Sequence, residues 1–471
     1  MFARLRSARP RVSVALAIVF TLPFVQVLPT RQALGHDDED GDKGDLTTGG
    51  EGSAAGTVFA AVNINQLGHV PKAVMGAGAS ERGSDLWGWT DSVSGDEYAL
   101  VGMTNGTAFV DVSDPVNPVY LGRLPTHTGS KAWRDIKVYA DHAYIVSDSN
   151  GAHGMQIFDL TRLRNVSGPP LTFTEDARYS GFNEAHNIVI NEDSGFAYAV
   201  GGETDAGGLH ILDLSNPISP VHVGSYAGDG YTHDAQVVTY HGPDTAHQGR
   251  EIALAFNENT VTIVDVNDKT APVQLSRTGY PNVAYTHQGW LTEDHAYLLQ
   301  NDENDEKDLS AVDATRTHVW NVQDLDIPIY IGFDEHSGVE SIDHNLYTLG
   351  NLAFEGNYTS GMRVVDISNI AASTADVNGR IDELDTVAWI DTHPAKDSRT
   401  SFDGVWSVYP YFSSGNILIG DRNEGLIIVS LDIPEPGTFA LIALASIVPG
   451  RRSRKHGSLN VSRSETRSHG L

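Results

Sequence analysis

The 471-residue sequence contains no cysteine, which excludes disulfide scaffolds, thiolate metal sites and cysteine nucleophiles. Basic residues are also scarce, because 31 Lys and Arg stand against 61 Asp and Glu and give a formal net charge of −30. A field of this sign repels nucleic acid and anionic membranes, and it favours cations, cationic partners and solubility. The phosphate-binding loop, nucleophile-elbow, His-Glu-x-x-His and dinucleotide motifs are missing as well.

What the chain does contain is a repeated pattern of two strands joined by a proline-bounded turn. Its four fullest copies are TAFVDVSDPVNPVYLG (107–122), GLHILDLSNPISPVHVG (208–224), TVTIVDVNDKTAPVQLS (260–276) and RTHVWNVQDLDIPIYIG (316–332). Shorter copies lie at 154–161, 361–368 and 425–432, so the equivalent positions are Asp111, Asp159, Asp213, Asp265, Asn321, Asp366 and Ser430. Strand-rich repeats at this spacing are typical of propeller blades. The sequence therefore predicts an all-β fold, a single β-propeller with seven blades and, as the alternative, six.

The two ends of the repeat array predict how the ring closes. The segment TVFAAVNI (57–64) forms a strand outside any complete unit, whereas the last unit lacks a fourth strand after residues 426–431. Pairing of N- and C-terminal strands in one blade would remove both exposed edges. The recurring Asp at the strand ends is predicted to form a turn by accepting a hydrogen bond from the following backbone.

Composition divides the chain into four segments. Residues 1–35 have an Arg-rich start, an apolar run and a small-residue cleavage site, which predicts a secretory signal peptide. Residues 36–56 are acidic, rich in Gly and predicted to be disordered. The propeller is predicted over 57–432. Residues 433–471 hold a Pro-Glu-Pro triplet (434–436), a short apolar run and an Arg cluster, which indicates a sorting and anchoring tail.

Two family resemblances attach to these features. The tail resembles the PEP-CTERM sorting signal, which implies export in a Gram-negative-type bacterium and processing by exosortase-type sorting machinery. FVDVSDPVNP, ILDLSNPISP, IVDVNDKTAP and the stretches YTHQGWLTEDHAYLLQNDEND and WSVYPYFSSGNILIGDRNEGLIIVSL resemble LVIVD-repeat proteins and, more closely, the choice-of-anchor B family. This resemblance implies an exported propeller at the cell surface, in the periplasm or outside the cell, and it implies no established reaction.

A second signature precedes the first strand of several units: WRDIKV (133–138), AHNIVI (185–190), THDAQV (232–237) and THQGWL (286–291), with divergent copies SGVESI (337–342) and FDGVWSV (402–408). Since innermost strands begin beside the central axis, these residues are expected to meet at one channel mouth. Three His with nearby carboxylates suit a divalent transition metal. The predicted metal ligands are His186, His233, His287, Asp234 and Asp135. The other polar residues predicted at the mouth are Arg134, Asn187, Gln288, Glu340 and Asp403.

Two further interpretations of the three His stay open. Each His could cap its turn through a hydrogen bond to the backbone, as a repeated structural device. His233 could instead act as a general base beside Asp234. A separate acidic segment, residues 301–308, offers oxygen ligands for Ca²⁺ but lacks the spacing and the Gly of an EF-hand. We therefore predict that this segment is a solvated loop.

The function predicted from the sequence is that of an exported binding protein rather than an enzyme, with an extracellular polysaccharide or a protein as ligand. The alternative is a metal-dependent extracellular hydrolase or lyase that uses the His at the channel mouth, and a third candidate is a structural matrix component. No nucleic-acid partner is expected, and membrane contact is expected only through the signal peptide and the tail. Apart from the divalent metal, no cofactor is predicted.

Overall fold

The computed structural model describes residues 56–394 and 398–433. The predicted signal peptide, nearly all of the acidic segment and the predicted sorting tail from Pro434 onward lie outside these ranges. Among the described residues, no helix has both the length and the apolar character needed to cross a membrane.

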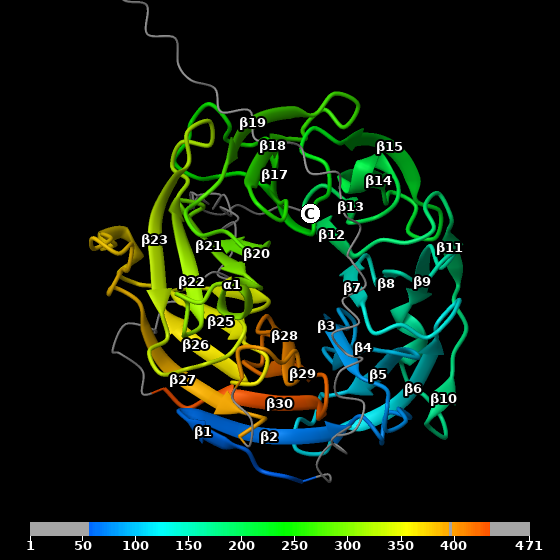
Figure 1. The fold of residues 1–471 in the computed structure, drawn as a ribbon. Helices are drawn as coiled ribbons and strands as arrows, with labels where there is room; N and C mark the ends of the chain where they lie inside the picture. Colours follow the sequence, from blue (N-terminus) through cyan, green and yellow to red (C-terminus); the bar gives the residue numbers. More distant parts are fainter. Residues whose placement is uncertain (1–55, 395–397, 434–471) are drawn as a thin grey trace, which may run out of the picture. The chain divides into compact units, whose positions relative to one another are not determined.

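Seven antiparallel blades follow one another around a ring, which confirms the predicted seven-bladed propeller (Figure 1). Blade 1 comprises β3 (Gly83–Thr90), β4 (Glu97–Met103), β5 (Gly106–Asp111) and β6 (Val119–Pro125), with β10 (Leu171–Thr172) parallel to β6. Blade 2 comprises β7 (Arg134–Tyr139), β8 (His142–Ser147), β9 (Met155–Asp159) and β11 (Ala177–Tyr179). Blade 3 comprises β12 (Asn187–Asn191), β13 (Phe196–Val200), β14 (Leu209–Asp213) and β15 (Val221–Tyr226).

The remaining blades repeat this order. Blade 4 comprises β16 (Asp234–Thr239), β17 (Glu251–Phe256), β18 (Val261–Asp265) and β19 (Val273–Thr278). Blade 5 comprises β20 (Thr286–Leu291), β21 (Tyr297–Asp302), β22 (Arg316–Asn321) and β23 (Ile329–Glu335). Blade 6 comprises β24 (Leu346–Leu349), β25 (Leu352–Gly356), β26 (Met362–Asp366) and β27 (Asp385–Asp391), and blade 7 comprises β28 (Val405–Tyr409), β29 (Ile417–Asp421) and β30 (Gly425–Leu431). The helical segments are short: η2 (Leu160–Leu163), η3 (Asp205–Gly207), α1 (Asp305–Asp308) and η4 (Ile370–Ala372).

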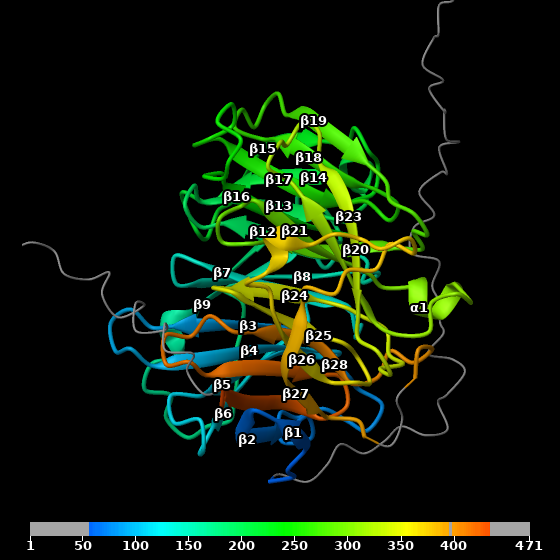
Figure 2. The same ribbon diagram turned by 90° about the vertical axis from the view of Figure 1, so that its left-hand side faces the viewer.

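The ring closes in blade 7, where strand β2 (Ile64–Pro71) supplies the missing fourth strand. It pairs antiparallel with β30 from Ile64 opposite Leu431 to Pro71 opposite Gly425, which confirms closure by the two ends. The predicted single strand at 57–64 is divided, however. Its residues form β1 (Ala60–Val62), which extends blade 6 by pairing with β27, and only the first residue of β2. A positive φ of 55° at Asn63 separates the two strands. Figure 2 shows β1 and β2 side by side below β27.

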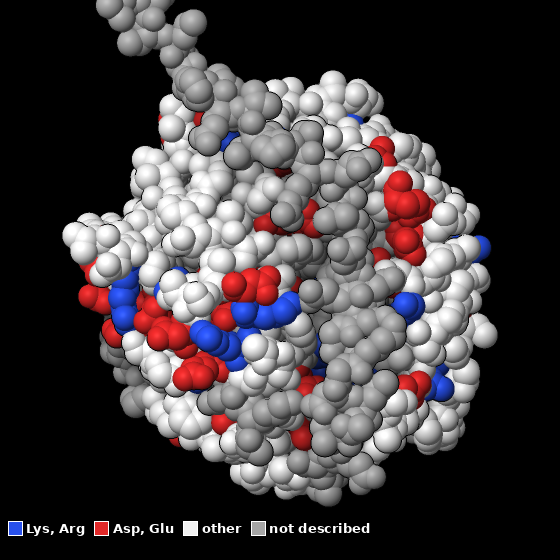
Figure 3. Space-filling model, in the orientation of Figure 1, with Lys and Arg blue, Asp and Glu red and all other residues white. Residues whose placement is uncertain are grey.

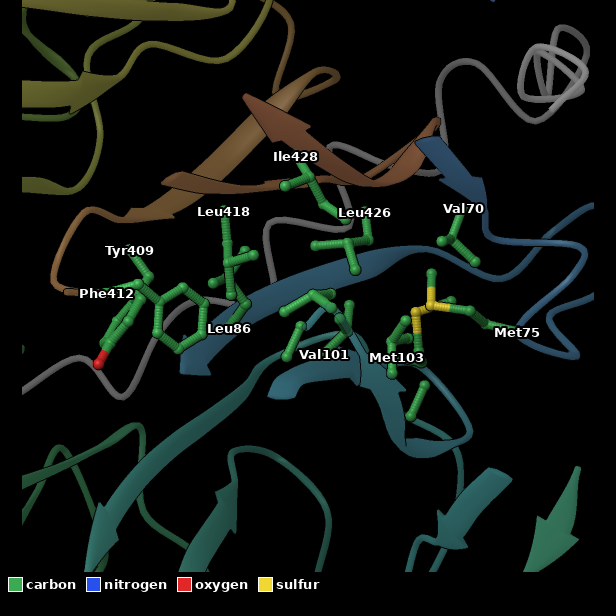
Figure 4. Close-up of a cluster of buried hydrophobic side chains, with 14 residues drawn as sticks. Val70, Met75, Leu86, Val101, Met103, Tyr409, Phe412, Leu418, Leu426 and Ile428 are labelled. Carbon is green, nitrogen blue, oxygen red and sulfur yellow. The ribbon is translucent and has the colours of Figure 1, made fainter. Parts of the chain in front are cut away.

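Apolar layers between consecutive blades hold the ring together. The layer between blades 7 and 1 brings Leu418 and Ile428 of blade 7 against Leu86 and Val101 of blade 1, and Val70 of the closing strand joins it (Figure 4). A corresponding buried layer lies at each of the other six blade junctions. In the absence of disulfides, burial of these layers is the main source of stability.

The repeated Asp residues form the predicted turns at the end of each third strand. In five blades the main-chain N–H two residues further on donates to the carboxylate, over 2.7–3.0 Å, at Asp111, Asp159, Asp213, Asp265 and Asp366. The Asn321 side chain accepts the equivalent bond at 3.0 Å. The repeated Asp is therefore a turn residue and part of the scaffold.

These turns contact the neighbouring blade through glycines in its outer strand. A Cβ built on Gly224 of β15 would lie 1.6 Å from the carbonyl oxygen of Lys269, which is in the turn of blade 4. A Cβ on Gly68 of β2 would lie 2.3 Å from the carbonyl oxygen of Pro115, at the same place in the turn of blade 1. Glycine is needed at both positions because one backbone approaches another this closely.

Gly224→Ala is therefore expected to destabilise the protein by about 3 kcal/mol, since the added methyl group forces blades 3 and 4 apart. Gly279→Ala is the matched control, because a Cβ there would meet its nearest atom at an ordinary 3.5 Å. Urea unfolding of both variants measures the difference. Equal midpoints would show that the turn of blade 4 can move aside without cost.

Candidate functional site

Four imidazoles from four consecutive blades lie in a row, each ring tilted against the next, where the inner strands begin. The ring centroids of His186 and His233 lie 4.2 Å apart, those of His233 and His287 lie 4.3 Å apart, and those of His287 and His344 lie 4.3 Å apart. The indole of Trp406 in blade 7 continues the series 4.6 Å from His344. All four His are buried. We call these four side chains the imidazole row.

A carboxylate lies beside the row. Glu303, in the segment that follows β21, places Oε2 3.6 Å from Nε2 of His287 and Oε1 3.6 Å from Nε2 of His344. The hydroxyl of Tyr358 donates to Oε1 at 2.6 Å. Burial raises the pKa of Glu303, and the bond from Tyr358 only partly offsets that rise. Glu303 therefore bridges two members of the row and keeps its oxygens turned toward them.

Main-chain carbonyls fix the tautomers of two rings. Nδ1 of His233 donates to the carbonyl oxygen of His287 at 3.1 Å, and Nδ1 of His344 donates to that of Trp406 at 2.6 Å. When Nδ1 carries the proton, the neutral ring keeps its lone pair on Nε2, as a metal-ligating imidazole requires. Burial lowers the pKa of His344 to about 3, so this ring is neutral at ordinary pH.

The other end of the row has the opposite electrostatics. Nδ1 of His186 donates to Oδ2 of Asp148 at 2.8 Å, and both side chains are buried. Burial alone would lower the pKa of His186, but the bond to Asp148 and the charge of that carboxylate raise it overall. The row therefore runs from an imidazole that readily holds a proton to one that does not.

Three groups in the middle of the row form a candidate metal centre. One ligand atom from each of His233, His287 and Glu303 lies within 4.8 Å of the others, and all three residues are buried. Two imidazole nitrogens and one carboxylate are a donor set suited to Zn²⁺ and similar transition metals. His344 could add a fourth ligand, because its Nε2 adjoins the same carboxylate.

The polar residues that accompany the row tie adjacent inner strands together. Asp135 Oδ2 accepts a hydrogen bond from the main-chain N–H of Ile188 at 2.7 Å. Asn187 donates to the carbonyl oxygen of His233 at 3.0 Å, and Gln288 bonds to strand β24 in the same way. Each of these hydrogen bonds joins a side chain of one blade to the main chain of the next blade. They therefore hold the inner ends of the blades in register.

Two predicted ligands belong to a separate group around a partly buried lysine. Lys137 Nζ lies 2.6 Å from Asp135 Oδ1 and 3.7 Å from Asp85 Oδ2, and 4.6 Å from the ring centroid of Trp87. Burial and the charge of Asp135 raise the pKa of Asp234 to about 7. Asp135 and Asp234 are thus coupled electrostatically to Lys137, a residue that the sequence reasoning did not single out.

The remaining predicted residues lie at different places. Arg134 is buried, its Nε donates to a main-chain oxygen, and its Nη1 lies 3.1 Å from Nε2 of His153. Glu340 is exposed, in the connection before β24. Asp403 accepts a hydrogen bond from Asn423 at 3.1 Å in the loop before β28. The position equivalent to the other His is thus occupied by His344 and not by Glu340.

The predicted His signature did not include His344, and Glu303 was placed in the acidic segment 301–308 and not beside the imidazoles. The dipeptide His344-Asn345 repeats His186-Asn187. This repeat could have identified His344 as the member of the His signature in blade 6. Glu303 directly follows β21 as Asp148 directly follows β8, but the repeated signature contains neither carboxylate.

Comparison with known proteins identifies LVIVD repeats in this chain. The LVIVD repeat model matches residues 91–126 and 184–228, which contain β4 to β6 and blade 3. No curated protein matches the sequence. A crystal structure of a protein from Lactobacillus plantarum is 12% identical, covers 73% of this chain and 89% of its own, and has a TM-score of 0.44. The β-propeller domain of Cps50 (Swd1) from Myceliophteria thermophila is 9% identical, with coverages of 72% and 94% and a TM-score of 0.44.

Proposed function

We propose that this protein is an exported binding scaffold of the cell surface or periplasm, and that its imidazole row holds a divalent transition metal at the propeller axis. The seven-bladed fold with LVIVD repeats supports the scaffold. The observation that carries the metal is the convergence of His233, His287 and Glu303 on one buried point. The metal would fix the inner ends of blades 4, 5 and 6 and thereby the face presented to a ligand.

The sequence supports the remaining parts of the proposal. The Arg-rich start and the apolar run favour export, and the Pro-Glu-Pro tail favours handling by exosortase-type sorting machinery. The strongly acidic composition favours a cationic protein surface or a polysaccharide that is bridged by cations, and it disfavours nucleic acid.

Elemental analysis of the full-length chain after incubation with Zn²⁺ and gel filtration tests the metal. About one bound ion per chain is expected, as in other sites of this donor set. His233→Ala combined with His287→Ala should abolish binding, whereas His142→Ala, which changes a His outside the row, should leave it unchanged. A parent protein that leaves the column without metal would contradict the proposal.

A metal-dependent hydrolase or lyase is the second candidate, and Glu303 favours it. A carboxyl group with a raised pKa beside imidazoles is equipped to transfer protons at neutral pH. If this candidate is right, Glu303→Gln should abolish turnover of polysaccharide or ester substrates in an activity screen while leaving ligand binding intact. Absence of turnover by the metal-loaded parent would count against it.

A further inference from the structure

A second polar group lies between blades 5 and 6, in the segment predicted to be a solvated loop. Asn301 lies near the end of β21, and Asp305 and Glu306 are the first residues of α1. Asp343 immediately precedes His344 in the chain. These four side chains are only 0–1% exposed. The prediction of a solvated loop for residues 301–308 is therefore wrong for Asn301, Asp305 and Glu306, because two blades enclose them. We call the four side chains the oxygen cluster.

Each carboxylate of the cluster has one oxygen that accepts a hydrogen bond or lies near an imidazole nitrogen. Asn301 Nδ2 donates to Asp343 Oδ2 at 3.0 Å, and the main-chain N–H of Arg316 donates to Glu306 Oε1 at 3.0 Å. Asp305 Oδ2 lies 3.7 Å from Nε2 of His318. These contacts fix the orientation of the carboxylates.

The other oxygens have no hydrogen-bond donor. Asp305 Oδ1, Glu306 Oε2, Asp343 Oδ1 and Asn301 Oδ1 are all buried and accept no hydrogen bond from the described residues. Unpaired buried oxygens of this kind are costly, and native proteins pair them with donors, water or ions.

The carboxyl groups of the cluster lie close enough to one another for their charges to repel. The charged groups that act most on the pKa of Glu306 are Asp343 and Asp305, and those that act most on Asp343 are Asp305 and Asp302. Burial and these like charges raise the pKa values of Glu306 and Asp343 well above the ordinary range. Figures 1 and 2 place α1 at the face of the ring that Figure 3 shows, where acidic and basic side chains adjoin over α1 and β25.

We propose that the oxygen cluster is a Ca²⁺ site formed by Asn301, Asp305, Glu306 and Asp343. Three carboxylates and one amide oxygen are hard ligands, and carboxylates that bind in bidentate fashion reach the six to eight oxygens that Ca²⁺ takes. A divalent cation would neutralise the like charges and give each unpaired oxygen a partner.

The site would act on the imidazole row through the chain itself. Asp343 is followed by His344, and Glu303 lies two residues before Asp305. A bound Ca²⁺ would therefore fix both chain segments that bring these groups to the axis. The inference does not rest on the proposed transition metal, because none of the four ligands belongs to the imidazole row.

Titration of the full-length, chelator-treated chain with Ca²⁺ by calorimetry tests the site, together with thermal unfolding in Ca²⁺ and in EGTA. One saturable site is expected, with Glu306→Gln and Asp343→Asn each weakening it about 100-fold or more, since charge count sets affinity in such sites. Each variant should melt below the parent in Ca²⁺ and at or above it in EGTA, where the buried like charges are a cost.

Two variants serve as controls. Asp308→Asn changes an exposed acid in the same helical turn and should bind Ca²⁺ like the parent. His233→Ala combined with His287→Ala should also keep Ca²⁺ binding, even if Zn²⁺ binding is lost or was never present. A parent that binds no Ca²⁺ at millimolar concentration, that binds Mg²⁺ in preference, or whose melting temperature is the same in Ca²⁺ and EGTA would overturn the proposal.

Discussion

A truncated chain that begins at Lys72 is expected to form no monomeric folded protein. It lacks β2, so the edge of β30 in blade 7 loses its partner along the whole strand. Leu426, Ile427 and Ile428 are fully buried in the complete ring, and an unpaired apolar edge strand promotes association between chains. Because the loss opens the ring, the cost should exceed the roughly 5–15 kcal/mol by which domains are stable.

Gel filtration and near-ultraviolet circular dichroism measure the outcome. The matched control is a chain that begins at Gly56, which retains β1 and β2 and should be monomeric with native spectra. A synthetic peptide spanning residues 57–71 should partly rescue the truncated chain by pairing with β30. A soluble monomer with native spectra and no peptide would contradict the expected role of β2.

Glu355→Gln is expected to cause the largest loss of stability among single substitutions in blade 6. Glu355 in β25 accepts hydrogen bonds from Nε2 of His336 and from Oγ1 of Thr317, both at 2.8 Å and both from blade 5. All three side chains are buried. Removing one partner of a buried ion pair typically costs about 3–5 kcal/mol, because the other charge is left without compensation.

The pH dependence of this loss follows from the two pKa shifts. Burial would raise the pKa of Glu355, but His336 and the hydrogen bonds lower it below 4.5, so its stabilisation is present above that pH and is lost as pH falls through the folded value. Burial would lower the pKa of His336, but Glu355 raises it above 6.5, so its stabilisation is present below pH 6.5 and is lost as pH rises through the folded value. The pair therefore contributes most between about pH 4.5 and 6.5.

Urea unfolding at pH 5.5 and at pH 8.5 tests this prediction. The difference between parent and Glu355→Gln should be larger at pH 5.5, where both partners of the parent are charged. Asp334, whose Oδ2 lies 4.0 Å from Nδ1 of His336, should soften the loss by remaining as a second carboxylate. Asp385→Asn, in an exposed position of the same blade, should change stability by less than about 0.5 kcal/mol. An equal loss at both pH values would show that shape and not charge holds this contact.

The fold was predictable because most blades repeat the same strand–turn–strand pattern, which depends on local interactions. The Asp that ends the third strand in five blades, as at Asp111 and Asp213, marks a turn whose geometry depends only on neighbouring residues. The spacing of these turns predicted the number of blades. The missing fourth strand of the last unit predicted that the N- and C-terminal strands pair in one blade. The exact division of 57–64 was not predictable, because the break at Asn63 depends on two strands from different blades.

The candidate site was predictable only where it repeats. His186, His233 and His287 share a signature, and the structure brings their rings together as neighbours. Glu303 could not be found in this way, since the repeated signature does not contain it. The burial of Asp305 could not be predicted from the sequence for a different reason. A dense run of acids is typical of solvent-facing loops, and only the packing of blade 6 over blade 5 encloses it.

The pairing of β2 with β30 also sets the order in which the ring can assemble. The strand that completes blade 7 is among the first to be synthesised, and its partner is among the last. Contacts between residues so distant in sequence form late, because the intervening chain must first become compact. Blades 1 to 6 can therefore stack in sequence as an open arc, but the closed and cooperative ring exists only once Leu431 has emerged. For a chain that crosses a membrane before it folds, this order would delay the final closure until β30 has crossed.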